Sequence, residues 1–131
     1  MSEGPVEIYD GMDDLHDIHT VVSASCPSCG GACAIDPAAV VLEGTGIGWV
    51  SSPTVVALQD AVLAQLAFDM DEFDGKRTLS STTDRHLSPW VAAQACGSCG
   101  AALWAVVSWG ETQPARWRLV FEGLVHALPD H

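Results

Sequence analysis

Basic residues are scarce in this chain. Of its 131 residues, 5 are Lys or Arg and 17 are Asp or Glu, which gives a formal net charge of −12. A surface of this charge repels the phosphates of nucleic acids and of anionic membranes. The composition therefore argues against direct binding to DNA, RNA or a membrane, and it favours a basic protein as the partner.

Long apolar runs and an export signal are also missing. The most apolar stretch, residues 90–107, is broken by Gln94, Ser98 and several glycines, so no segment is expected to span a bilayer. The first residues carry neither the basic cluster nor the apolar run of a signal peptide. The 5 cysteines are an odd number and cluster in pairs, which favours reduced thiols. We expect a soluble, cytoplasmic protein.

Two Cys-x-x-Cys-Gly motifs stand far apart in the chain, at Cys26–Gly30 and at Cys96–Gly100. The spacing of two residues lets both sulfurs of a motif point at one ion, and the following glycine lets backbone amides turn toward the sulfurs. Together the motifs supply four thiolates, the number that a tetrahedral structural zinc site needs. The sequence predicts one structural Zn²⁺, with the ligands Cys26, Cys29, Cys96 and Cys99.

These two motifs resemble the knuckles of zinc-ribbon and treble-clef proteins, and the resemblance covers only the residues of the motifs. It implies a site closed by four thiolates, without an open position for water, and hence no catalysis at the metal. The alternatives are a redox-active pair, an iron–sulfur cluster, or cysteines that only fill the core. A thioredoxin-like pair opens a helix, and neither motif precedes a convincing helical pattern.

The remaining pattern predicts a single α+β domain, a small antiparallel sheet with one main helix, stapled by the zinc-ribbon-like site. Residues 1–17 are expected to be an acidic, partly disordered N-terminal segment, and residues 18–131 the zinc-stapled domain. Ser52 and Pro53 form a helix start, followed by an apolar stripe at spacings of three and four. We expect a helix over 53–70, a polar loop over 76–84, and strands at 18–25, 38–42, 89–95, 101–109 and 116–125.

Several other residues carry possible chemistry. Cys33 is a reactive thiol, a replacement ligand or a buried small residue, and the simplest interpretation is a free thiol near the site. His16 and His19 lie among aspartates, and would suit a second, weaker metal site if their segment were helical; otherwise they are solvated. The acids of residues 69–74 do not match the ligand register of an EF-hand, because Phe73 occupies a ligand position.

A third group of residues lies in the second half of the chain. The loop of residues 80–86 contains Asp84 and His86 beside serines and threonines, a weak basis for a hydrolytic centre and a common composition for a polar loop. Arg116 and Arg118 either form ion pairs, with Glu111 nearby, or grip an anion.

The chain has 5 tryptophans, most of which we expect in the core. Trp104 and Trp109 are an odd number of positions apart in one expected strand, so they face opposite sides and one of them is expected to be exposed. An exposed tryptophan among acids is typical of a protein-binding hot spot.

The sequence favours a non-catalytic protein–protein interaction module that docks a basic partner. An inhibitor or immunity protein for a basic toxin or nuclease is one concrete form, since complementary charge speeds capture of a cationic active site. The alternative is a small enzyme or biosynthetic accessory protein, with a pocket between helix and sheet lined by Asp84, His86 and the two arginines. A third candidate is an adaptor that contacts the protein subunits of nucleic-acid machinery.

Overall fold

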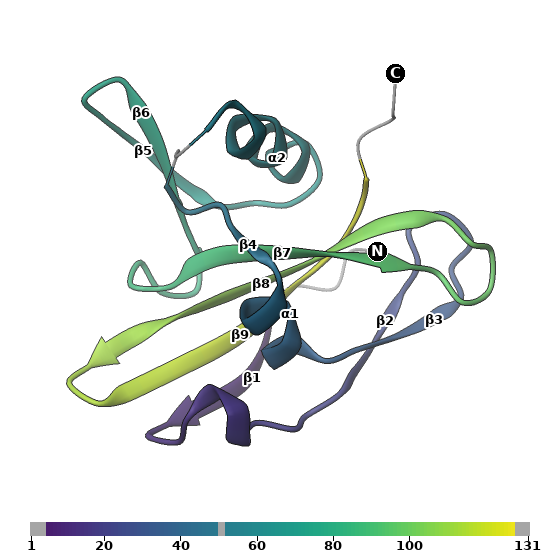
Figure 1. Cartoon of the computed structure of the whole chain (residues 1–131), viewed down its shortest axis with the longest axis horizontal. Helices are drawn as coiled ribbons and strands as arrows, with labels where there is room; N and C mark the ends of the chain where they lie inside the picture. The colour runs from purple at the N-terminus through teal and green to yellow at the C-terminus, as the bar shows by residue number, and fades with distance from the viewer. Residues whose placement is uncertain (1–4, 50–51, 128–131) are drawn as a thin grey trace.

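The computed structural model describes residues 5–49 and 52–127 (Figure 1). Its main sheet is antiparallel and five-stranded, in the order β1 (Val6–Gly11), β9 (Arg116–His126), β8 (Ala102–Gln113), β7 (Ser88–Ala95) and β4 (Thr45–Gly46). Two hairpins stand apart from it: β2 (Val22–Ser25) with β3 (Ala32–Ile35), and β5 (Asp69–Phe73) with β6 (Lys76–Ser80). The helices are α1 (Pro37–Glu43), α2 (Pro53–Leu63) and the short 3-10 helix η1 (Leu15–Asp17). The class is α+β with small antiparallel sheets, as predicted, but with two α-helices instead of one main helix.

The main sheet is covered on both faces. One apolar cluster joins one face of β8, including Leu103 and Val107, to α1 and to the β2–β3 hairpin. A second cluster joins Val106 and Val91 to α2 and β6. Val106 and Val107 belong to different clusters because successive side chains of a strand point to opposite faces.

Both α-helices begin with an N-cap residue that is followed by a proline. Ser52 caps α2 and Asp36 caps α1, each side chain accepting a hydrogen bond from the backbone N–H three residues later, and a proline follows each cap. The start of α2 was predicted from the sequence, and the start of α1 was not. The predicted strand at 38–42 is therefore wrong: those residues lie in α1, whose small and β-branched side chains are buried against the sheet.

The predicted helix over 53–70 is too long. It ends at Leu63, and Met70, predicted to be on its apolar stripe, lies instead in β5 with 60% of its surface exposed. Asp74 and Gly75 both have positive φ, 54° and 74°, and connect the paired residues Phe73 and Lys76. An Asp-Gly turn of this kind closes a tight hairpin, so the expected polar loop begins with strand β6.

Ordered structure begins earlier than the expected Ile18. Residues 6–11 form β1 and pair with β9 at the edge of the main sheet. Arginines of β9 hold the acids of β1: Arg118 pairs with Glu7, and Arg116 pairs with Asp10. The acidic residues that suggested disorder therefore help to attach β1 to β9.

The predicted knuckles are the turns of two hairpins. One joins β2 to β3 and the other joins β7 to β8, and both lie on the right in Figure 1. No helix of the described residues is long and apolar enough to cross a membrane.

Candidate metal centre

The four predicted ligands lie together. The Sγ atoms of Cys26, Cys29, Cys96 and Cys99 are all within 4.8 Å of one another. Sγ of Cys26 is 3.9 Å from that of Cys99, and Sγ of Cys29 is 3.6 Å from that of Cys96. Sulfurs about 2.3 Å from a tetrahedral ion are separated by roughly 3.8 Å, so the two cross-knuckle pairs already have the spacing that an ion requires.

Each knuckle is built by the same backbone turn. The N–H of the glycine that follows the second cysteine donates to the carbonyl of the first: Gly30 to Cys26 at 2.8 Å, and Gly100 to Cys96 at 2.9 Å. Both glycines have positive φ, 76° and 73°, a conformation that glycine adopts without strain. The Gly in each Cys-x-x-Cys-Gly motif is thereby explained.

Backbone amides point at the sulfurs, as the motif predicts. The N–H of Ser28 donates to Sγ of Cys26, and that of Ser98 to Sγ of Cys96, each at 3.4 Å. The N–H of Gly31 lies 3.3 Å from Sγ of Cys29. Hydrogen bonds to a thiolate stabilise its charge, so the site is prepared for deprotonated ligands.

The pKa values of the Cys96 and Cys99 thiols are shifted in opposite directions. Backbone N–H groups of Cys99 and Ser98 lower the pKa of Cys96 to about 6. For Cys99 the N–H of Ala101 acts in the same direction, but burial and the neighbouring thiols outweigh it and raise the pKa to about 12. A divalent ion removes this conflict because it holds several thiolates at once. The donor set thus fits a thiophilic metal ion.

The centre is half-buried. Cys26 and Cys96 are 3% and 2% exposed and belong to the core cluster around α1, whereas Cys29 and Cys99 are exposed. Cys33 is also buried, in β3, and burial raises the pKa of its thiol. It pairs with Ala24 across the hairpin and packs in the core beside the centre. Its place is that of a small core residue next to the ligands, and it is not in the four-cysteine group.

The histidine pair is not assembled into a site. His16 lies in η1, is exposed, and contacts Asp14 through its Nδ1 at 2.8 Å, while His19 follows that short helix. The segment lacks the helix that would place both rings on one face. Among the described residues, the four cysteines are the one group of three or more side chains that could hold an ion.

The loop and hairpin residues do gather, but at the end of the main sheet. Asp84, His86, Arg116 and Arg118 line a pocket of about 500 Å³. Arg118 binds Asp84 and Glu7, Arg116 binds Asp10, and Nδ1 of His86 lies 2.9 Å from Asp84. The pKa of Asp84 is lowered by the backbone N–H of His86, by the ring of His86 and by the guanidinium of Arg118. The ion pairs are formed with these acids and not with Glu111, which accepts from the N–H of Ala115.

A hydrolytic centre is not assembled there. Among the described residues, no hydroxyl or thiol group hydrogen-bonds to His86, and the Ser81 hydroxyl is buried and accepts from the N–H of Thr83.

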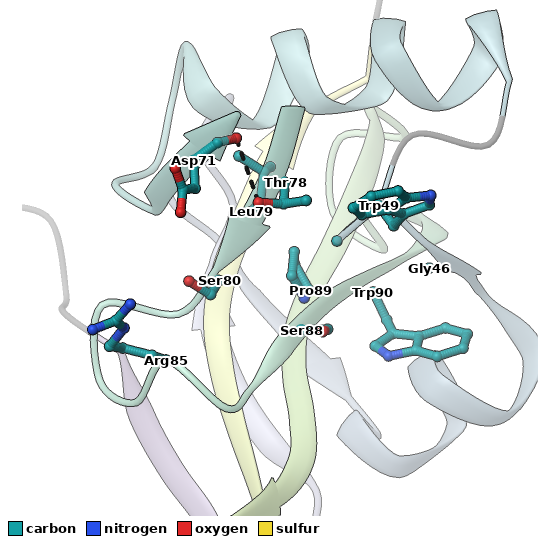
Figure 2. Close-up of a pocket in the computed structure, with 11 residues that line it drawn as sticks. Gly46, Trp49, Asp71, Thr78, Leu79, Ser80, Arg85, Ser88, Pro89 and Trp90 are labelled. Atoms are coloured by element: carbon teal, nitrogen blue, oxygen red, sulfur yellow. Dashed lines mark hydrogen bonds between the residues drawn. The ribbon is translucent and has the colours of Figure 1, made fainter. Parts of the chain in front are cut away.

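A second pocket, of about 590 Å³, lies where β6 meets β7 (Figure 2). Trp49 and Asp71 stand on either side of Thr78, and Arg85 lies farther along the pocket. We call it the Trp49 pocket. The sequence did not predict this pocket: Trp49 is one of five tryptophans of which most were expected in the core, and Asp71 was considered only as a calcium ligand. Its signal was a tryptophan next to a glycine-rich turn, which does not by itself indicate exposure.

The tryptophans predicted to face opposite sides do so. Trp104 packs on the cluster around α2 and Trp109 on the cluster around α1, where it stacks on Trp117 with ring centroids 5.2 Å apart. Both are partly buried, and the tryptophan that is exposed is Trp49, at 48%.

Comparison of the chain with protein-family models, with curated proteins and with solved structures finds no match.

Proposed function

We propose that this protein is a non-catalytic interaction module, in which a structural zinc centre holds an acidic α+β domain that docks a basic protein. Zinc is the metal that four tetrahedral thiolates from two knuckles suit best. With every position of the ion taken by sulfur, no site remains for water or substrate, so the metal serves folding. A reducing compartment such as the cytoplasm keeps such ligands available.

The uncompensated negative charge carries the proposal. Of the 5 basic side chains, Arg77, Arg116 and Arg118 are already paired with acids of the same domain. These arginines pair with four acids, and most of the other acidic residues within 5–49 and 52–127 are exposed and form no ion pair with a lysine or arginine. Such a field speeds and selects the approach of a basic surface. An inhibitor or immunity protein for a basic toxin or nuclease is a concrete form of this function.

Native mass spectrometry of the protein, isolated gently from its own host, tests the proposal. We expect one zinc per chain and a stoichiometric protein partner of high isoelectric point, whose complex re-forms from the purified components and weakens with added salt. Binding of the isolated domain to DNA or RNA, or a zinc-loaded protein with no partner, would contradict it.

The alternative, a small enzyme or biosynthetic accessory protein, is supported by the pocket that gathers Asp84, His86 and the two arginines. It differs from the expected pocket between helix and sheet, since it lies at the end of the main sheet. Against it, the ionic contacts of both arginines are already made to acids of the protein. A small-molecule ligand that shifts the NMR signals of His86 and Arg118 would favour the enzyme over the docking module.

A further inference from the structure

Three side chains of the Trp49 pocket, those of Asp71, Thr78 and Trp49, lie in a row across neighbouring strands. Thr78 in β6 pairs with Asp71 of β5 on one side and with Trp49 on the other. Directly opposed residues of antiparallel strands have their side chains on the same face. Since neighbouring strands are about 4.8 Å apart, the backbones of Asp71 and Trp49 flank that of Thr78 and are separated from each other by roughly 10 Å. Figure 2 shows Thr78 between the carboxylate and the indole.

The row offers an aromatic face, a negative charge and a hydroxyl acceptor. Trp49 is 48% exposed. One carboxylate oxygen of Asp71 accepts from the N–H of Glu72 at 2.9 Å, and no basic side chain of residues 5–49 and 52–127 lies within ion-pair distance of Asp71. The Thr78 hydroxyl donates to the carbonyl of Asp71 at 3.4 Å, which leaves its oxygen free to accept.

We propose that the Trp49 pocket receives an arginine side chain of the basic partner, a proposal that rests on the function proposed above. A guanidinium is planar, so it can lie against the indole of Trp49 and at the same time donate to Asp71 and Thr78. Arginine fits better than lysine, because stacking and several in-plane donors are used together. An exposed tryptophan at such a position is typical of the residues that dominate protein–protein binding.

The rest of the pocket is compatible with a protein ligand. Its volume of about 590 Å³ exceeds that of a guanidinium, which leaves room for the backbone beside the arginine. Arg85, exposed at the far end and without an ion-pair partner among the described residues, can bind a carbonyl or carboxylate of the partner. One exposed arginine in a chain of net charge −12 is a weak basis for an anion site.

The test uses a matched pair of peptides on the zinc-loaded, full-length protein. One is the acetylated and amidated pentapeptide Gly-Ser-Arg-Ser-Gly, and its twin has citrulline, a neutral isostere, in place of arginine. Binding is followed through the indole N–H signals in ¹H–¹⁵N NMR, where the signal missing from Trp49→Leu identifies Trp49. We expect the arginine peptide to shift that signal saturably and the citrulline peptide to bind several-fold more weakly.

Three variants locate the site. Asp71→Asn and Trp49→Leu should each weaken binding of the arginine peptide by about two- to fivefold, the range for one exposed ion pair or cation–π contact. Because Trp49→Leu lacks the Trp49 signal, its binding is followed through the indole N–H of Trp90, which lines the same pocket. Glu72→Gln is the control: it removes the same charge at the next residue, whose side chain points to the opposite face of the hairpin. It should leave the affinity unchanged.

Equal binding of the two peptides, or equal loss in Glu72→Gln and Asp71→Asn, would overturn the proposal, because either result indicates diffuse attraction to an acidic surface. Stronger binding of a peptide with aspartate in place of arginine would overturn it in favour of an anion site at Arg85. The failure of the proposed function is read separately, from the absence of a stoichiometric basic partner in the native mass spectrum.

Discussion

Glu122 places a carboxyl group inside the core. It is 4% exposed and accepts a hydrogen bond from the Ser108 hydroxyl at 2.7 Å. In β9 it is an extra residue: Val106 pairs with Gly123 and Val107 with Phe121, so Glu122 is the bulged position. Burial raises the pKa of Glu122, and the hydroxyls of Ser108 and Ser81 offset this only in part. Folding therefore favours the protonated form of Glu122 more than the unfolded chain does.

A pH-dependent stability follows from Glu122. The pKa of Glu122 is higher in the folded than in the unfolded protein. Its contribution to the free energy of unfolding is therefore complete below the pKa of the unfolded state, and it is lost as the pH rises through the pKa of the folded state. Glu122→Gln should remove this dependence and stabilise the protein at pH 8 by about 1–3 kcal/mol, the cost of an ill-paired buried charge. Urea unfolding at pH 5 and pH 8 measures it. Glu72→Gln, at an exposed acid, serves as control, and an unchanged pH slope in Glu122→Gln would contradict the assignment.

The grouping of the four cysteines was predictable from sequence, while the residues of the Trp49 pocket were not. The cysteine pairs carry their geometry in local spacing, since two sulfurs and a glycine turn are set within five residues. Asp71, Thr78 and Trp49 come from three separate segments, and only the pairing of β6 with both neighbours places them side by side. Glu122 is similar: its burial depends on a bulge, which no local pattern indicates.

Among the elements, those specified by local chemistry were predicted and those specified by packing were not. Strands β7, β8 and β9 and the start of α2 were expected at nearly their observed positions. Small and β-branched residues at 38–42 suit both a strand and a buried helix, and here the Asp36 cap and the sheet beneath decide for α1. The β5–β6 hairpin was missed because the stripe of α2 runs on in sequence beyond Leu63.

The turn of the β5–β6 hairpin can be tested by a single substitution. Gly75 has a φ of +74°, and a methyl group there would meet nothing within 4 Å. Gly75→Ala therefore introduces backbone strain without a clash, and it should destabilise the hairpin by about 1 kcal/mol. Hydrogen exchange should speed up selectively in β5 and β6.

Gly97 provides the matched control for this change. It too has open space around its Cα, but no positive φ. Gly97→Ala should leave exchange in β5 and β6 as in the wild type. Equal protection of the hairpin in Gly75→Ala and Gly97→Ala would show that the turn does not depend on glycine.

On the scale of the whole molecule, the four-cysteine group joins distant parts of the chain. The knuckles are contributed by β2–β3, early in the sequence, and by β7–β8, late in it, and residues 30–95 form the loop that a bound metal would close. Closing a long loop restricts the unfolded chain strongly. Within the described part of the chain, strands β2 and β3 pair only with each other. The metal is thus expected to hold this hairpin to the main sheet.

The central claim is that one structural zinc holds the fold together, and its most direct test is unfolding with and without metal. Thermal unfolding is followed by circular dichroism, in a buffer that contains a phosphine reductant to keep the thiols reduced. Native mass spectrometry counts the bound metal. We predict one zinc per chain, a cooperative transition that is lost after chelation, and the same loss in Cys96→Ser. Cys33→Ala, at a cysteine as buried but outside the four-cysteine group, should keep both the metal and the transition. An unchanged cooperative transition after removal of the metal would contradict the account.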